Sequence, residues 1–125
     1  MIPIERRKNM DFNNNLPIYV QVILDIKKNI IKGSIGLGEK LPSGRDLALK
    51  YKINPNTSSR IYKELEMEEL CYTKRGLGTY VTEDTMKIKE IKEDMSGQLL
   101  EDFIAGMKDL GFQIEEVIEL LKKKY

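Results

Sequence analysis

Residues 41–82 read LPSGRDLALKYKINPNTSSRIYKELEMEELCYTKRGLGTYVT, and the rest of the chain is organised around this stretch. It predicts a short helix, a turn and a longer helix. Ser43 can cap the short helix, and Asp46 three residues later completes the pattern of a capping box. Asn54 can cap the longer helix, with Pro55 at its first position, where a backbone N–H is not needed. The pattern therefore predicts two helices joined by a tight turn.

The longer helix is expected to have one apolar side and one polar side. Ile61 and Leu65 follow the spacing of an inward face, which Met67 and Leu70 extend. The opposite side begins with side chains that can form hydrogen bonds: Asn56, Thr57, Ser59, Arg60 and Lys63. Two tightly joined helices, the second polar at its N-terminal end, are the arrangement that reads a DNA major groove.

A hairpin is predicted directly after these helices, with short strands at residues 71–74 and 79–82. Its tip, residues 75–78, holds two glycines, which permit positive φ and leave no side chain to keep the backbone away from a phosphate or a minor groove. Cys71 is expected to face the helices by strand alternation and to be buried. A helix-turn-helix followed by such a β wing is a winged-helix DNA-binding domain.

An earlier helix is predicted to begin at Pro17 and to end near Lys32, before Gly33. Apolar residues recur along it at helical spacing and are expected to face inward: Ile18, Val22, Ile23, Ile26 and Ile30. A loop over residues 35–40 then leads into a short strand around Leu41.

After Thr82 the chain becomes acidic, and two further helices are predicted. The first carries an apolar stripe formed by Ile88, Ile91, Met95, Leu99, Phe103 and Met107. Gly111 interrupts it, and a second helix over residues 113–124 is expected to turn Ile114, Val117, Ile118 and Leu121 inward. A helix pair this small cannot bury both stripes by itself. The tail therefore either folds back onto the winged domain or pairs with the same segment of a second chain.

Charge is divided unevenly along the chain, although the 125 residues together carry a net charge of only +1. Residues 1–82 contain 14 Lys and Arg against 9 Asp and Glu, whereas residues 83–125 contain 7 against 11. The small net charge of the whole chain thus conceals a basic first part and an acidic second part. The positive charge of the first part favours a nucleic-acid partner. Scatter among solvated charges is the alternative explanation.

The composition argues against an enzyme, a metal site and a membrane protein. The chain has one Cys and no His, so a disulfide framework, a zinc site and a His-based catalytic centre are not expected. No apolar run approaches the ~20 residues of a spanning helix, and no signal peptide is visible. We therefore expect a cytoplasmic protein without a cofactor.

Several motifs follow one another in order: PIYVQ at 17–21, LPSGRDLA at 41–48, NPNT at 54–57, YKELE at 62–66 and RGLGTYV at 75–81. Together they resemble the DNA-binding domain of the GntR family of bacterial transcription regulators. The two-helix tail is similar to the short-tailed YtrA-type subgroup, which lacks the large ligand-binding domain of most relatives. The resemblance implies a mainly α fold with a small β wing (α+β): an N-terminal arm or leader at 1–15, a winged helix-turn-helix at 16–82 and a two-helix dimerisation tail at 83–125.

The resemblance also implies which residues contact an operator. Arg45 matches a family arginine that contacts DNA, and Gly76 matches the wing-tip residue that approaches the minor groove. Ser59 stands where many relatives have an arginine that reads a guanine, and Arg60 beside it is a candidate substitute. The expected DNA-binding set is Arg45, Asn54, Asn56, Thr57, Ser59, Arg60, Lys63, Lys74, Arg75, Gly76 and Thr79. Glu69 stands where relatives usually have Gly, so we expect a left-handed backbone there.

The first nine residues have two explanations. Relatives usually begin just before a Phe-containing segment that precedes PIY, which here is residues 10–12. Glu5 to Lys8 can be encoded by GAA-AGG-AGG-AAA, which contains a ribosome-binding sequence shortly before the Met10 codon. One hypothesis therefore takes Met10 as the true start and residues 1–9 as mistranslated leader. The other takes residues 1–9 as a basic arm that touches DNA.

The residues and the resemblance together predict a sequence-specific transcription regulator, namely a dimeric repressor that binds an inverted-repeat operator. The resemblance implies control of the protein's own operon, with transporter genes among its targets. The alternative is a winged-helix protein-interaction module that does not bind DNA. The tail offers no polar cluster inside an apolar pocket, so a small-molecule site of the usual kind is not visible. The alternative is an effector site between the tail and the winged domain or at the dimer seam, where the Met and Phe residues would favour a hydrophobic effector.

Overall fold

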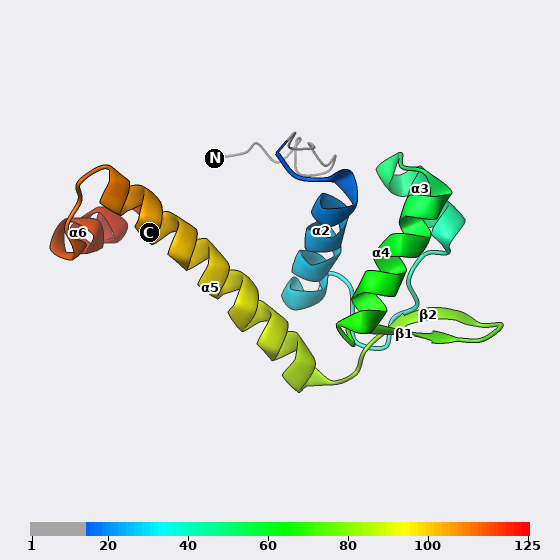
Figure 1. Ribbon diagram of the computed structural model, residues 1–125. Helices are drawn as coiled ribbons and strands as arrows, with labels where there is room; N and C mark the ends of the chain where they lie inside the picture. The colour runs from blue at the N-terminus through cyan, green and yellow to red at the C-terminus, as the bar shows by residue number, and fades with distance from the viewer. Residues whose placement is uncertain (1–14) are drawn as a thin grey trace. The chain divides into compact units, whose positions relative to one another are not determined.

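The computed structural model describes residues 15–125, in which five helices and two strands are found (Figure 1). They follow the order α2, α3, α4, β1, β2, α5 and α6, which confirms the predicted mainly α fold with a small β wing. The chain divides into two compact units, the first ending at Lys89 and the second covering Glu90–Tyr125. The two hypotheses for residues 1–9 lie outside the described residues. No helix within residues 15–125 combines the length and the apolar character that crossing a bilayer requires.

Helix α2, Ile18–Lys32, packs one face into the core of the first unit. Its inward side chains are at most 7% exposed: Val22, Ile23, Ile26 and Ile30. Gly33 ends the helix in the left-handed conformation, with φ at 83°, as predicted. The predicted inward position of Ile18 is wrong, because this residue lies in the first turn, beyond the end of the core, and is 48% exposed.

Helices α3, Gly44–Tyr51, and α4, Pro55–Met67, form the predicted helix-turn-helix. Ser43 Oγ caps α3 by accepting a hydrogen bond from an N–H of its first turn, at 3.1 Å. Asn54 Oδ1 caps α4 in the same way, at 2.8 Å. Both predicted caps are confirmed. Lys52 ends α3 in a left-handed conformation, with φ at 56°, which no sequence pattern indicated.

The core of the first unit lies where α2, α4 and the wing meet. Its fully buried apolar side chains are Val22, Ile61, Leu65, Leu70 and Val81. Ile61 and Leu65 therefore form the inward face of α4, as predicted. The predicted inward position of Met67 is wrong, because two residues after Leu65 the helix has turned by about 200°. Met67 is 76% exposed.

Two polar links tie α2 to the helix-turn-helix. The Tyr51 hydroxyl donates a hydrogen bond to Asp25 Oδ2 at 2.7 Å. Burial and the Asp25 carboxylate raise the pKa of Tyr51, so the hydroxyl stays protonated and keeps donating. Lys27 Nζ lies 2.8 Å from a carboxylate oxygen of Glu68, and the Lys27 side chain is only 12% exposed. These links fix α2 against both α3 and the end of α4.

The wing consists of two antiparallel strands, β1, Cys71–Lys74, and β2, Gly78–Val81. β2 begins and ends one residue earlier than predicted, because pairing starts at the second glycine of the tip. Lys40 forms a bridge with Tyr80, so the predicted short strand near Leu41 is a single bridge. Cys71 is 4% exposed, as predicted, and burial raises the pKa of its thiol to about 12.

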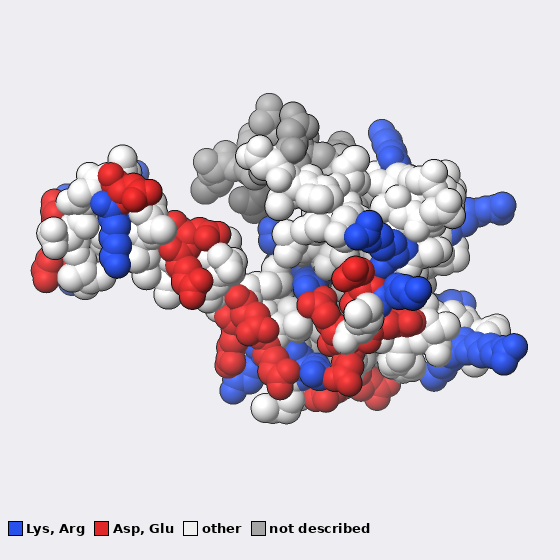
Figure 2. Space-filling view, viewed as in Figure 1, with Lys and Arg blue, Asp and Glu red and all other residues white. Residues whose placement is uncertain are grey.

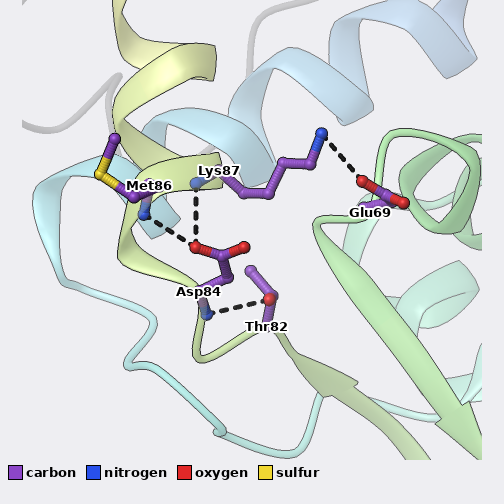
Figure 3. Close-up of polar contacts among 5 residues, drawn as sticks. All are labelled: Glu69, Thr82, Asp84, Met86 and Lys87. Atoms are coloured by element: carbon purple, nitrogen blue, oxygen red, sulfur yellow. Dashed lines mark hydrogen bonds and ion pairs between the residues drawn. The ribbon is translucent and has the colours of Figure 1, made fainter.

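A short series of hydrogen bonds connects the end of the wing to α5, Thr85–Asp109 (Figure 3). Thr82 Oγ1 accepts a hydrogen bond from the Asp84 N–H at 3.1 Å. Asp84 Oδ1 in turn accepts hydrogen bonds from the N–H groups of Met86 and Lys87, at 3.0 and 3.4 Å. The Asp84 carboxylate thus caps α5 at the end where the helix dipole favours negative charge.

The second unit consists of the rest of α5 and of α6, Ile114–Lys124. Gly111 separates the two helices with φ at 85°, at the predicted break, and Gln113 caps α6. Within residues 90–125, Val117 is the one buried side chain, at 8% exposure. The other residues predicted to face inward in this unit are half-buried or exposed in the single chain: Ile91, Met95, Leu99, Phe103, Met107, Ile114, Ile118 and Leu121.

Glu69 lies two residues after the end of α4 and adopts the predicted left-handed conformation, with φ at 60°. A side chain in this conformation costs about 1 kcal/mol relative to Gly. Glu69→Gly is therefore expected to raise the free energy of unfolding by about 1 kcal/mol and the thermal midpoint by roughly 4 °C. Thermal unfolding followed by circular dichroism measures this change.

Glu69 also forms an ion pair with Lys87, at 2.8 Å (Figure 3). The Glu69 side chain is 68% exposed, so the pair contributes little to stability. Glu69→Gln is the matched control, because it removes the ion pair but leaves a side chain on the left-handed backbone. Its midpoint is expected to be unchanged or slightly lower. If Glu69→Gly melts no higher than the unmodified chain, backbone strain at this position is not a cost to the fold.

Candidate nucleic-acid interface

The N-terminal half of α4 presents polar side chains at the surface of the first unit. Those of Asn56, Ser59, Arg60 and Lys63 are exposed, and that of Thr57 is half-buried. The first N–H groups of a helix have no partner inside the helix, and together with the helix dipole they favour an anion at this end. Asn54 Oδ1 accepts the capping hydrogen bond of α4, and the amide N–H groups of the same side chain can donate to a DNA phosphate.

A groove of about 640 Å³ lies between the start of α3, α4 and the wing strands. Its walls bring together four of the predicted DNA-binding residues, namely Ser59, Arg60 and Lys63 from α4 and Thr79 from β2. The others lie outside these walls: Arg45, Asn54, Asn56, Thr57, Lys74, Arg75 and Gly76. The groove therefore joins the polar side of α4 to the wing.

The hydroxyl of Thr79 is engaged within the wing. Thr73 Oγ1 donates a hydrogen bond to the Glu66 carboxylate and lies 3.2 Å from Thr79 Oγ1. Because the Thr73 hydrogen is already used, Thr79 is the donor in the second pair. Thr79 would have to break this bond before its hydroxyl could donate to a phosphate.

The wing strands hold a positive charge beside two aromatic rings. The rings of Tyr72 and Tyr80 are stacked with their centres 6.0 Å apart. Lys74 Nζ lies 4.9 Å from the centre of the Tyr80 ring and 5.7 Å from that of Tyr72. Arg75 is exposed at the tip, next to Gly76 with φ at 79°. Lys74 is thus held along the strands of the wing, whereas Arg75 lies at its tip.

Lys40 is a further cation of the wing that the sequence motifs did not single out. A Cβ added to Gly78 would lie 2.7 Å from Lys40 Cε, so the Lys40 side chain crosses the wing where Gly78 leaves space. Gly78 also has φ at 132°, a conformation that residues with side chains rarely adopt. A glycine in a strand commonly marks such a close approach, but the sequence pattern placed Gly78 in the hairpin tip, and only the structure shows that it begins β2.

Free positive charge is available on this part of the molecule. Figure 2 shows Lys and Arg side chains projecting from the edge of the first unit where α3 and the wing lie, and Asp and Glu side chains along α5. Arg45, Lys63 and Arg75 form no ion pair with any residue from 15 to 125. Such cations can neutralise DNA phosphates. Over the same described residues, no group of three or more His, Cys, Asp or Glu side chains is placed to hold a metal ion.

Comparison with known proteins gives consistent matches along the chain. The sequence profile of the gntR family, described as bacterial regulatory proteins, matches residues 18–81. The HTH-type transcriptional repressor YtrA of Bacillus subtilis (strain 168) is 38% identical over 115 residues, which are 91% of this chain and 88% of YtrA. A solved GntR family transcriptional regulator from Listeria monocytogenes is 43% identical with a TM-score of 0.84, over 90% of this chain and 98% of that one. The DNA-binding domain of AraR, solved in complex with operator ORX1, is 30% identical with a TM-score of 0.52, over 54% of this chain and 81% of that one.

Proposed function

Because the chain belongs to the GntR family of bacterial regulatory proteins, we propose that it is a dimeric repressor that binds an inverted-repeat operator. Family membership makes the helix-turn-helix a DNA-binding element and the protein a transcription regulator rather than an enzyme. Family membership alone does not imply an inverted-repeat operator, a dimer or repression. Separate features support each of these three proposals.

The groove shared by α4 and the wing is the observation that carries the proposal. Its α4 wall places Ser59, Arg60 and Lys63 beside β2. A helix in the major groove with a wing along the neighbouring backbone would use both walls at once. Arg45, exposed in the first turn of α3, supplies a further cation for the operator.

The exposed apolar residues of the second unit support a dimer. Leu99 is 68% exposed and Phe103 is 38% exposed in the single chain. The hollow between α5 and α6, about 420 Å³, is lined on the α5 side by residues that include Ile104 and Lys108. Helix α6 therefore covers the Ile104 side of α5, and Leu99 lies on another side. A second copy of the chain would cover this side, because a two-fold dimer pairs the same patch on both copies.

A two-fold dimer would present two copies of α4 to successive major grooves on one side of the DNA. These grooves are about 34 Å apart, so the operator is expected to be an inverted repeat with half-sites about 10 bp apart. The similarity to YtrA, a repressor by name, along most of both chains supports repression. We further propose that the target is the protein's own operon, with transporter genes in it.

Selection from random-sequence DNA tests this function. The full chain is mixed with random duplexes of about 30 bp, and the bound fraction is sequenced; an inverted repeat is expected. Affinity is then measured for the selected duplex and for a scrambled duplex over a salt series. The logarithm of affinity is expected to fall with the logarithm of salt concentration by about 0.9 per phosphate contact.

The other outcomes are equally informative. Equal affinity for the selected and scrambled duplexes contradicts sequence-specific regulation. Binding to neither duplex at low salt favours the protein-interaction module that does not bind DNA. A monomer in sedimentation at micromolar concentration contradicts the dimer and supports a tail that packs within its own chain.

A further inference from the structure

Tyr19 and Arg60 form a stacked pair that joins the start of α2 to α4. The guanidinium carbon of Arg60 lies 3.8 Å from the centre of the Tyr19 ring, which places the cation over the ring face. Tyr19 is half-buried and Arg60 is exposed. We propose that Tyr19 is a positioning residue that holds Arg60 in the orientation in which Arg60 binds DNA. This inference rests on the DNA-binding function proposed above.

Stacking on the ring leaves the hydrogen-bonding edge of Arg60 free. The five N–H groups of a guanidinium lie in its plane, and an aromatic ring covers one face of that plane. An arginine that is already ordered loses less conformational freedom when it binds a partner. The Tyr19 ring thus holds the N–H groups of Arg60 in an orientation that suits a pair of oxygen or nitrogen acceptors. A phosphate and the O6/N7 edge of guanine both provide such a pair.

Arg60 forms no ion pair within residues 15–125, whereas Lys27, which also faces α4 from α2, is paired with Glu68 at 2.8 Å. Arg60 is also the single arginine of α4. The preceding Ser59 has a short side chain whose Oγ lies 3.5 Å from the Pro55 carbonyl oxygen, one turn back. Arg60 is therefore the α4 side chain with the reach, the charge and the fixed orientation for bidentate binding.

A double-mutant cycle tests the positioning role. The variants are Tyr19→Leu, Arg60→Ala, their combination and Tyr19→Phe, each measured as the full chain on the selected duplex and on the scrambled duplex. Tyr19→Leu is expected to weaken binding to the selected duplex about fivefold, because the ring face is lost. Tyr19→Phe keeps the ring and is expected to bind within about twofold of the unmodified chain. In the Arg60→Ala background, Tyr19→Leu is expected to have no further effect.

The salt series identifies the acceptor. If Arg60 binds a phosphate, Arg60→Ala weakens binding to both duplexes and lowers the salt slope by about 0.9. If Arg60 binds a guanine edge, the loss is confined to the selected duplex and the slope is kept. Either result supports the proposal.

Several results would overturn the proposal. Equal losses from Tyr19→Leu with and without Arg60 would show that the two residues act independently. A Tyr19→Phe variant as weak as Tyr19→Leu would assign the effect to the tyrosine hydroxyl. Thermal midpoints are compared for all variants, and Tyr19→Met, a flexible apolar replacement, repeats the cycle if Leu at this position unfolds the chain. An unmodified chain that binds no DNA would overturn both this inference and the proposed function, whereas DNA binding without coupling overturns this inference alone.

Discussion

Replacing Arg45 with alanine is expected to weaken binding to the selected operator by about 10- to 100-fold while leaving the thermal midpoint unchanged. Arg45 lies in the first turn of α3, is exposed, and forms no ion pair with the described residues. Truncation is therefore expected to remove the proposed contact to DNA without removing an ion pair among the described residues. Affinity by fluorescence anisotropy and midpoint by circular dichroism measure the two quantities separately.

Lys28→Ala is the matched control for Arg45→Ala. It also removes one exposed positive charge, but from α2, outside the predicted DNA-binding set. Its effect is expected to be about threefold or less, since only the general attraction to DNA is reduced. Combining Arg45→Ala with Arg60→Ala is expected to abolish selective binding. If the combined variant stays folded and keeps its affinity, the recognition surface lies elsewhere on the molecule.

Placing a glutamate at Phe103 is expected to convert the dimer into a monomer and to weaken operator binding by about 100-fold or more. In the proposed dimer this side chain is covered by the second copy, so a carboxylate there would lose its hydration without gaining a partner. A monomer holds only one half-site at a time, which removes the gain from simultaneous binding. Sedimentation and operator affinity are measured on the same preparation.

Ala105→Glu provides the control for Phe103→Glu. It introduces the same carboxylate on α5, two residues later and therefore about 200° around the helix. Ala105 is exposed in the single chain. This control is expected to stay dimeric and to keep its affinity. A dimeric Phe103→Glu variant would exclude this side of α5 as the interface, and two monomeric variants would show that α5 tolerates no added charge on either side.

The parts of the fold that were predictable from sequence depend on local chemistry. Ser43 and Asn54 accept hydrogen bonds from N–H groups two or three residues away, so a short window of sequence reveals both helix starts. Gly33 and Gly111 end helices through their own backbone conformation. The prediction for Met67 is wrong because it rested on the apolar nature of the side chain. The helical rotation from Leu65 turns Met67 away from the core.

The sequence predicted only those parts of the candidate site whose residues form a local pattern. The polar side of α4 follows from helical spacing, and the wing tip follows from its glycines. The pairing of Tyr19 with Arg60, and the path of Lys40 over Gly78, depend on how distant segments pack together. No local pattern specifies either contact. Gly78 was visible in the sequence as a glycine of the hairpin tip, but its neighbour Lys40 was not.

Cys71, the one cysteine of the chain, is buried in the wing and can report on the opening of the wing. Thiol reagents react with the thiolate form of cysteine. In the folded domain, burial keeps reagents away from Cys71 and raises the pKa of its thiol, so that little thiolate forms. Labelling can therefore proceed only through molecules whose wing has opened away from α4. The rate of labelling reads out the opening equilibrium of the DNA-binding domain without any engineered probe. A DNA complex that holds the wing closed would slow this labelling. The labelling rate of Cys71 would therefore report whether the operator is bound.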